Sequence, residues 1–101
     1  MIKYKVYTKE KGLVETDNFE HINELTWHRE YGPALIGYND SGSKVRDQYW
    51  VNSKLHRLNG PADIGYDMNG NIKYVAYWIN DIAYTEEQYD KELLKLKVQS
   101  L

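Results

Sequence analysis

The sequence has no cysteine, which excludes disulfide bonds and thiolate metal sites. A large excess of either charge is also absent, because 13 Lys and Arg against 15 Asp and Glu leave a net charge of −2. That balance excludes a strongly basic nucleic-acid-binding surface. No apolar run approaches the roughly 18 residues that a membrane-spanning helix needs, and the first residues lack the apolar core of a secretion signal. We therefore expect a cytoplasmic protein that contacts neither nucleic acid nor membrane directly.

Phenylalanine occurs once, whereas tyrosine occurs ten times and tryptophan three times in 101 residues. Amphipathic aromatics favour half-buried sheets and binding surfaces over sealed cores. A hydrophobic content of 42% with 28% charged residues is typical of a globular chain. The length predicts a single domain over 1–101.

A gap-free internal repeat of 28 residues dominates the chain. Residues 27–54 match 55–82 at twelve identical positions: His28/His56, Arg29/Arg57, Gly32/Gly60, Pro33/Pro61, Ala34/Ala62, Ile36/Ile64, Gly37/Gly65, Tyr38/Tyr66, Gly42/Gly70, Tyr49/Tyr77, Trp50/Trp78 and Asn52/Asn80. Each unit carries a Gly-Pro turn, a hairpin turn ("NDSGS", "DMNGN") and a third turn at Asn52 or Asn80, with β-rich runs between them.

These signals predict a mainly β fold: an antiparallel β-meander of two hairpin repeats, 27–54 and 55–82. A degenerate N-terminal hairpin over 1–26 precedes them. A C-terminal helix over 85–99, with Thr85 as N-cap and Gln88 completing a capping box, closes the stack.

Alternation along the first strand of each unit gives two faces. We expect one set of residues to face the core in each unit, Ala34, Ile36 and Tyr38 in the first and Ala62, Ile64 and Tyr66 in the second. The opposite set is Leu35, Gly37 and Asn39 in the first unit and Asp63, Gly65 and Asp67 in the second. Neighbouring Tyr and Trp must point to opposite faces. Helical spacing in the C-terminal segment predicts two apolar stripes, one of which can pack on the sheet while the other faces solvent or a partner. The stripes are Tyr89, Leu93 and Leu96, and Leu94, Val98 and Leu101.

The repeated His-Arg pairs admit two interpretations. Repetition favours a scaffold role, in which imidazole bonds to turn backbone and guanidinium lies over a tyrosine or pairs with a carboxylate. A histidine beside an arginine can also hold an anion or a nucleotide phosphate. The candidate anion-binding residues are His28, Arg29, His56 and Arg57.

No catalytic arrangement emerges from the sequence. There is no zinc-binding spacing of histidines, no Ser/His/Asp arrangement and no phosphate-binding loop in a strand–loop–helix context. We therefore expect a non-enzymatic protein without cofactor or metal.

The motif "HRxxGPA" followed by a glycine turn and "YWxN" resembles the short β-hairpin repeats, similar in style to MORN repeats, of bacteriophage and giant-virus proteins. The likeness covers 27–82 and departs from MORN repeats in period and glycine placement. It implies a β-meander scaffold of viral origin, which would act in the host cytoplasm.

Small phage accessory proteins without catalytic motifs often block host machinery. The leading hypothesis is accordingly an inhibitor that binds a host defence protein, in the manner of an anti-CRISPR protein. The predicted protein-binding residues are Tyr49, Trp50, Tyr77, Trp78, Leu94 and Val98. Two alternatives remain: a protein that sequesters a nucleotide-like anion, and a structural or self-assembling protein that forms a homodimer or larger homo-oligomer through the spare helix stripe.

Overall fold

The computed structural model describes residues 1–99, which form nine strands and one helix. The strands are β1 (Lys3–Thr8), β2 (Gly12–Thr16), β3 (Leu35–Tyr38), β4 (Lys44–Gln48), β5 (Trp50–Val51), β6 (Lys54–Leu55), β7 (Asp63–Tyr66), β8 (Ile72–Ile79) and β9 (Ile82–Tyr84). The helix α1 spans Glu86–Gln99.

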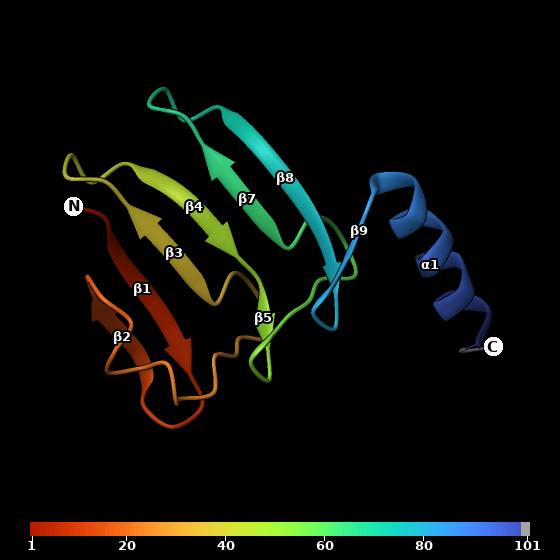
Figure 1. Cartoon of the computed structure of the whole chain (residues 1–101), viewed down its shortest axis with the longest axis horizontal. Helices are drawn as coiled ribbons and strands as arrows, with labels where there is room; N and C mark the ends of the chain where they lie inside the picture. Colours follow the sequence, from red (N-terminus) through yellow and green to blue (C-terminus); the bar gives the residue numbers. More distant parts are fainter. Residues whose placement is uncertain (100–101) are drawn as a thin grey trace.

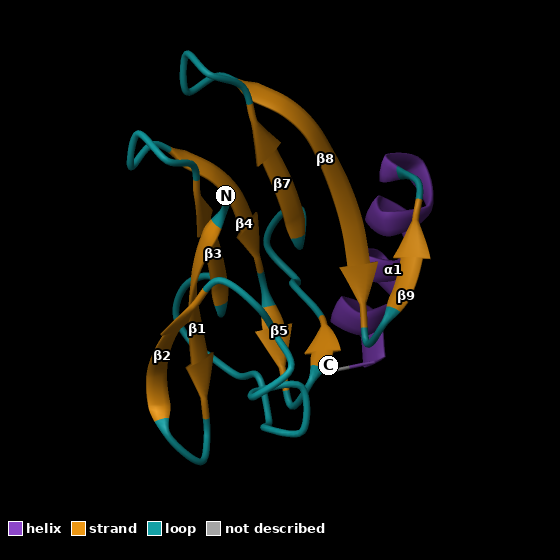
Figure 2. Ribbon diagram, turned by 60° about the vertical axis from the view of Figure 1, so that its left-hand side comes forward, coloured by secondary structure: helices purple, strands orange, loops and turns teal. Residues whose placement is uncertain are grey.

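Seven strands make one antiparallel sheet in the order β2-β1-β3-β4-β7-β8-β9, and β5 and β6 form a small second pair. Figure 1 shows this meander, with β1 and β2 at one end and β8, β9 and α1 at the other. Turned by 60°, the sheet is strongly curved, with α1 beside β9 (Figure 2). The predicted fold class is confirmed, including the N-terminal hairpin and the C-terminal helix.

The two repeats have matching turns, because the same residue types hold the same strained positions. Asn52 and Asn80 both have left-handed backbone, with φ of 50° and 49°. The residue after each is left-handed too, which gives the two-residue hairpin turn that follows the twist of the strands. The Asn39–Ser43 and Asp67–Asn71 turns each contain the same two backbone hydrogen bonds. The first residue donates to the last at 3.0 and 2.9 Å, and the glycine, Gly42 or Gly70, donates to the first residue at 2.9 and 3.1 Å.

The main apolar cluster lies on the sheet face opposite to the one predicted. Val6, Ile22 and Leu35 form its buried centre, and partly buried Tyr4, Val14, Phe19, Leu25, Trp27 and Trp50 surround it. Ile36 is only half-buried, although Ala34, on the predicted face, is fully buried. In the first repeat the expectation of a core on the Ile36 face was wrong, because residues 17–27 fold over the Leu35 face. In the second repeat the predicted face is buried at Ala62 and Ile64, which are 0% and 8% exposed. Alternation defines two faces but does not say which one a distant segment covers.

The helix begins where the capping box predicts. Thr85 Oγ1 accepts a 3.1 Å bond from the Gln88 amide, and Gln88 Oε1 accepts a 3.0 Å bond from the Thr85 amide. Tyr89 is buried and its ring packs on Tyr77, with centroids 4.7 Å apart. Leu94 and Val98 are exposed, as expected for the second stripe. Leu101, the last member of that stripe, lies outside the described residues.

Candidate functional site

The side chains of each His-Arg pair make equivalent hydrogen bonds to turns of their own repeat. His28 Nδ1 accepts from the Asn52 amide and His56 Nδ1 accepts from the Asn80 amide, both at 3.1 Å. Each imidazole therefore stabilises a left-handed asparagine turn that lies 24 residues later in the chain. The acceptor role requires a neutral ring with its proton on Nε2.

Each arginine lies flat on a tyrosine. The Arg29 guanidinium is 4.0 Å from the Tyr7 ring centroid, and that of Arg57 is 3.9 Å from the Tyr49 ring centroid. One guanidinium nitrogen of each donates to the proline carbonyl of the Gly-Pro turn, Arg29 to Pro33 and Arg57 to Pro61. The arginines thus tie each Gly-Pro turn to the preceding strand.

The close fit explains the glycine of each Gly-Pro turn. A Cβ built on Gly32 would lie 3.1 Å from the Arg29 guanidinium, and one on Gly60 would lie 3.0 Å from that of Arg57. Both glycines also have positive φ, 121° and 151°. "HRxxGP" is therefore a structural unit in which histidine, arginine and glycine each have a packing task.

The structure also brings Arg29, His56 and Arg57 to the wall of one shallow groove of ≈ 480 Å³. His28 does not line it, and Glu30 does, so the groove carries opposing charge. Burial lowers the pKa of His56 below its ordinary value of 6.5, which keeps the imidazole neutral. The positive charge of the groove therefore comes from Arg29 and Arg57 alone.

The four aromatic residues predicted to bind protein are all half-buried. As expected, neighbouring Tyr and Trp serve opposite faces: Tyr49 lies under Arg57, while Trp50 packs edge-on against Trp27 with centroids 5.1 Å apart. Trp50 Nε1 donates to Gln48 Oε1 at 3.0 Å. Ala76 holds the place of Gln48 in the second repeat, and the buried Trp78 Nε1 has no hydrogen-bond partner within residues 1–99. The two tryptophans are thus equivalent in position but not in their hydrogen bonding.

Leu94 and Val98, the other two predicted protein-binding residues, are 63% and 67% exposed. Leu94 lines a groove of ≈ 520 Å³ together with Leu58, Leu93, Asp90 and Lys97. Leu58, from the His-Arg segment of the second repeat, is itself 47% exposed. We call Leu58, Leu94 and Val98 the C-terminal apolar surface.

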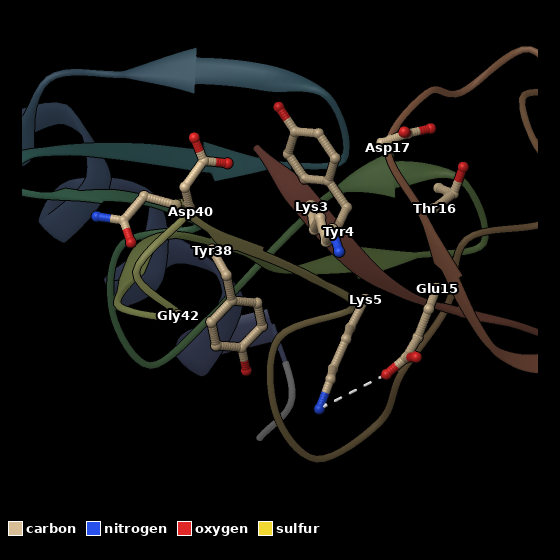
Figure 3. Close-up of a pocket in the computed structure, with 10 residues that line it drawn as sticks. Lys3, Tyr4, Lys5, Glu15, Thr16, Asp17, Tyr38, Asp40 and Gly42 are labelled. Atoms are coloured by element: carbon tan, nitrogen blue, oxygen red, sulfur yellow. Dashed lines mark ion pairs between the residues drawn. The ribbon is translucent and has the colours of Figure 1, made fainter. Parts of the chain in front are cut away.

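A hollow of ≈ 670 Å³ lies at the opposite end of the sheet, among β1, β2 and the β3–β4 turn (Figure 3). Lys5 contacts both Glu15, at 3.8 Å, and the Tyr38 ring, whose centroid is 5.6 Å from its Nζ atom. Lys3 and Lys5 share the lining with Glu15, Asp17 and Asp40, so it offers no field of one sign. This mixture gives no reason to expect an anionic or a cationic ligand there.

Two polar clusters between the repeats had no counterpart in the sequence predictions. Arg46 and Asp63 form a two-pronged pair, with bonds of 3.1 and 2.9 Å across β4 and β7. Asp47, only 4% exposed, accepts from Tyr66 Oη and pairs with Lys44, both at 2.8 Å. This pairing raises the pKa of Lys44. The signal that could have found them is strand register, because Arg46 lies beside Gly65 and Asp47 beside Ile64.

Among residues 1–99, no group of three or more His, Cys, Asp or Glu side chains could hold a metal ion. Their one helix is too short and too polar to cross a membrane. Comparison with models of protein families, with curated proteins and with solved structures found no match for this chain. Function therefore rests on the site itself.

Proposed function

We propose that this chain is a non-enzymatic module that binds another protein through its C-terminal apolar surface. The observation that carries the proposal is the exposure of Leu58 and Leu94 in one groove whose lining includes Asp90 and Lys97, with exposed Val98 one helical turn after Leu94. An apolar centre with charged residues around it is the usual anatomy of a protein interface. Leucine and valine exposed to this extent on one patch contribute little to the stability of a monomer.

Packing favours this surface over the aromatic pairs as the point of contact. Trp50 belongs to the apolar cluster, and Tyr49 and Tyr77 are covered by Arg57 and Tyr89. A partner could reach these rings only in part. We therefore assign Leu94 and Val98 the anchoring role, with the half-buried aromatics supporting the sheet beneath.

A second candidate function, anion sequestration, is supported by the groove that Arg29, His56 and Arg57 share. Against it stand the tasks these groups already perform. Each guanidinium lies against a tyrosine and donates to a proline carbonyl, and the His56 Nδ1 atom accepts from backbone. Glu30 in the same groove opposes an anion. Protein binding is the better-supported function.

The expectation that the partner is a defence protein of a viral host comes from the repeat resemblance and stays a prediction. So does the homodimer. A homodimer through Leu94 and Val98 would make the surface isologous. Light scattering at two concentrations separates a homodimer from a module that is monomeric until it meets its partner.

The test is affinity capture with quantified binding of the captured protein to three forms of the chain. These are the wild type, a double variant Leu94→Ser with Val98→Ser, and the control Lys95→Ser on the same helix. Both serines replace exposed side chains, so thermal unfolding should stay within about 0.5 kcal/mol of wild type. We expect the double variant to lose most binding and Lys95→Ser to keep it. Equal binding by all three forms would contradict the proposed surface.

A further inference from the structure

The outer edge of β8 is uncovered along half its length. β9 pairs with β8 only at Tyr77, Trp78 and Ile79. Among residues 1–99, no strand pairs with the outer side of Ile72–Ala76, and Figure 1 shows that edge facing away from the rest of the molecule. The inner side pairs with β7 at Ile72, Tyr74, Val75 and Ala76, with a register shift at Lys73.

The chain covers the equivalent edge twice elsewhere, each time in the same register. β3 lies on β1 with Gly37 beside Tyr4, and β7 lies on β4 with Gly65 beside Arg46. The residue before each glycine is isoleucine, Ile36 beside Lys5 and Ile64 beside Asp47. β8 is the third strand of this series. Its pairing with β7 places Tyr74 at the position of Tyr4 and Arg46, and Val75 at that of Lys5 and Asp47.

The residue types on β4 and β8 are the reverse of those expected for an interior strand and a free edge. β4 is interior yet carries Lys44, Arg46, Asp47 and Gln48, whereas the β8 edge carries Ile72, Tyr74, Val75 and Ala76. Ile72 is 63% exposed, and Tyr74 and Val75 are each 41% exposed. Proteins usually protect a free edge with charge, proline or a bulge, because unpaired backbone groups template pairing with another chain. On this edge the protection is confined to Lys73, where a charge and a register shift coincide, and Tyr74, Val75 and Ala76 carry neither.

The backbone groups available to a partner follow from the register. Ile79 and Ile82 close the two-residue turn at Asn80 and Asp81, so their amide and carbonyl groups face each other. Alternation along β8 then turns the amides of Tyr77 and Val75 to the same side. The Tyr77 amide faces β9 and the Val75 amide points outward, whereas the register shift at Lys73 ends the alternation.

We propose that Ile72–Ala76 accepts an extended segment of the partner protein as an additional antiparallel strand. The segment carries a β-branched apolar residue followed by glycine, so that the first lies beside Val75 and the glycine beside Tyr74. This deepens the proposed function and rests on it, since the C-terminal apolar surface and the β8 edge would serve one partner. Backbone pairing supplies affinity, and the glycine beside Tyr74 supplies selectivity.

A second copy of this chain fits the edge less well. Its own Ile-Gly strands, β3 and β7, are each paired on both sides. Among residues 1–99 it could offer only strands with a free edge, and none of these contains Ile-Gly: β2, β5, β6, β8 and β9. Antiparallel self-pairing centred on Tyr74 would also set one tyrosine against the other, where both internal junctions use glycine.

The probe is a synthetic peptide with the sequence of residues 59–67, Asn-Gly-Pro-Ala-Asp-Ile-Gly-Tyr-Asp, titrated into the isotope-labelled full chain and followed by NMR. We expect chemical-shift changes along Ile72–Ala76 and slowed amide exchange at Val75. A peptide with valine in place of its second glycine should bind about tenfold more weakly. The variant Val75→Pro removes an outward N–H without touching the β7 ladder and should abolish binding, whereas Val75→Ala keeps the N–H and should bind.

Three results would overturn the proposal: no shift at β8 up to about 1 mM peptide, equal binding of the glycine and valine peptides, or dimerisation of the free chain that Val75→Pro abolishes. Unfolding curves of Val75→Pro verify that it is folded, and the peptide pair decides the matter if it is not. Capture of the partner separates this inference from the proposed function. If Val75→Pro still captures it while Leu94→Ser with Val98→Ser does not, the edge assignment fails and the apolar surface stands.

Discussion

The imidazole of His56 accepts, at Nδ1, a 3.1 Å hydrogen bond from the backbone amide of Asn80. That amide belongs to a left-handed residue at φ 49°, so the histidine stabilises a turn that the backbone alone does not favour. Protonation of the ring would turn the acceptor into a donor facing an N–H group. Folding is therefore linked to the protonation of His56.

The pH dependence of stability follows from this bond. Burial lowers the pKa of folded His56 below 6.5, so between the two values the unfolded chain binds more protons than the folded chain. The contribution of His56 to the free energy of unfolding is complete above pH 6.5 and is lost as the pH falls toward the folded pKa. Urea unfolding at about pH 7.5 and about pH 5.5 measures the loss.

The variant His56→Asn should lose less stability over the same interval, because its Oδ1 atom accepts the bond without titrating. His56→Ala removes the acceptor as well, and should be less stable than wild type by about 1 kcal/mol at the higher pH. An identical pH dependence in the wild type and in His56→Asn would contradict the linkage.

The architecture was predictable because both repeats have the same turn-forming residues at the same positions. Asn52 and Asn80, Gly32 and Gly60 take matching conformations since the same residue types meet the same steric demand. The scaffold interpretation of the His-Arg pairs also anticipated imidazole on turn backbone and guanidinium on tyrosine, as at His56 and at Arg57. Local sequence determines these features, which is why they could be read from it.

Core placement was not predictable in the same way. Leu35 and Asp63 hold equivalent places in the two repeats and are both buried. Leu35 joins the apolar cluster, because the segment with Ile22 reaches it. Asp63 instead meets the guanidinium of Arg46. Which neighbour covers a strand depends on contacts between distant segments, and no periodicity within one repeat encodes them.

A glycine beside a tyrosine is the second feature open to test. A Cβ on Gly65 would lie 2.0 Å from Tyr74 Cε1, whereas one on Gly37 would lie 3.3 Å from Tyr4 Cε1. Gly65→Ala must therefore displace the Tyr74 ring, and we expect a loss of about 1–3 kcal/mol in the free energy of unfolding. Gly37→Ala should cost less.

A double-mutant cycle with Tyr74→Ala identifies the cause of that loss. Without the Tyr74 ring, Gly65→Ala should cost less than it does in the wild type, and the two changes should not add. Additive losses, measured by urea unfolding, would mean that the glycine is required for another reason.

The attachment of the helix depends on one hydroxyl. Tyr89 Oη donates to the carbonyls of Arg57 and Gly60, at 2.6 and 2.9 Å, and accepts from the Gly60 amide at 3.2 Å. Tyr89 thereby bonds to the second Gly-Pro turn. The 28-residue period would place a third His-Arg pair at positions 84 and 85, where the chain has Tyr84 and Thr85. Thr85, which begins the helix instead, and Tyr89, which docks it, together end the repeat.

Tyr89→Phe keeps the ring contact with Tyr77 but leaves these backbone groups without their partner. We expect it to destabilise the protein by about 1–2 kcal/mol and to speed amide exchange at Gly60. Tyr89→Ala removes the ring too and should cost about 3–5 kcal/mol. Both losses are measured by urea unfolding with exchange followed by NMR. If Tyr89→Phe were as stable as the wild type with Gly60 equally protected, the helix would be held by its apolar contacts alone.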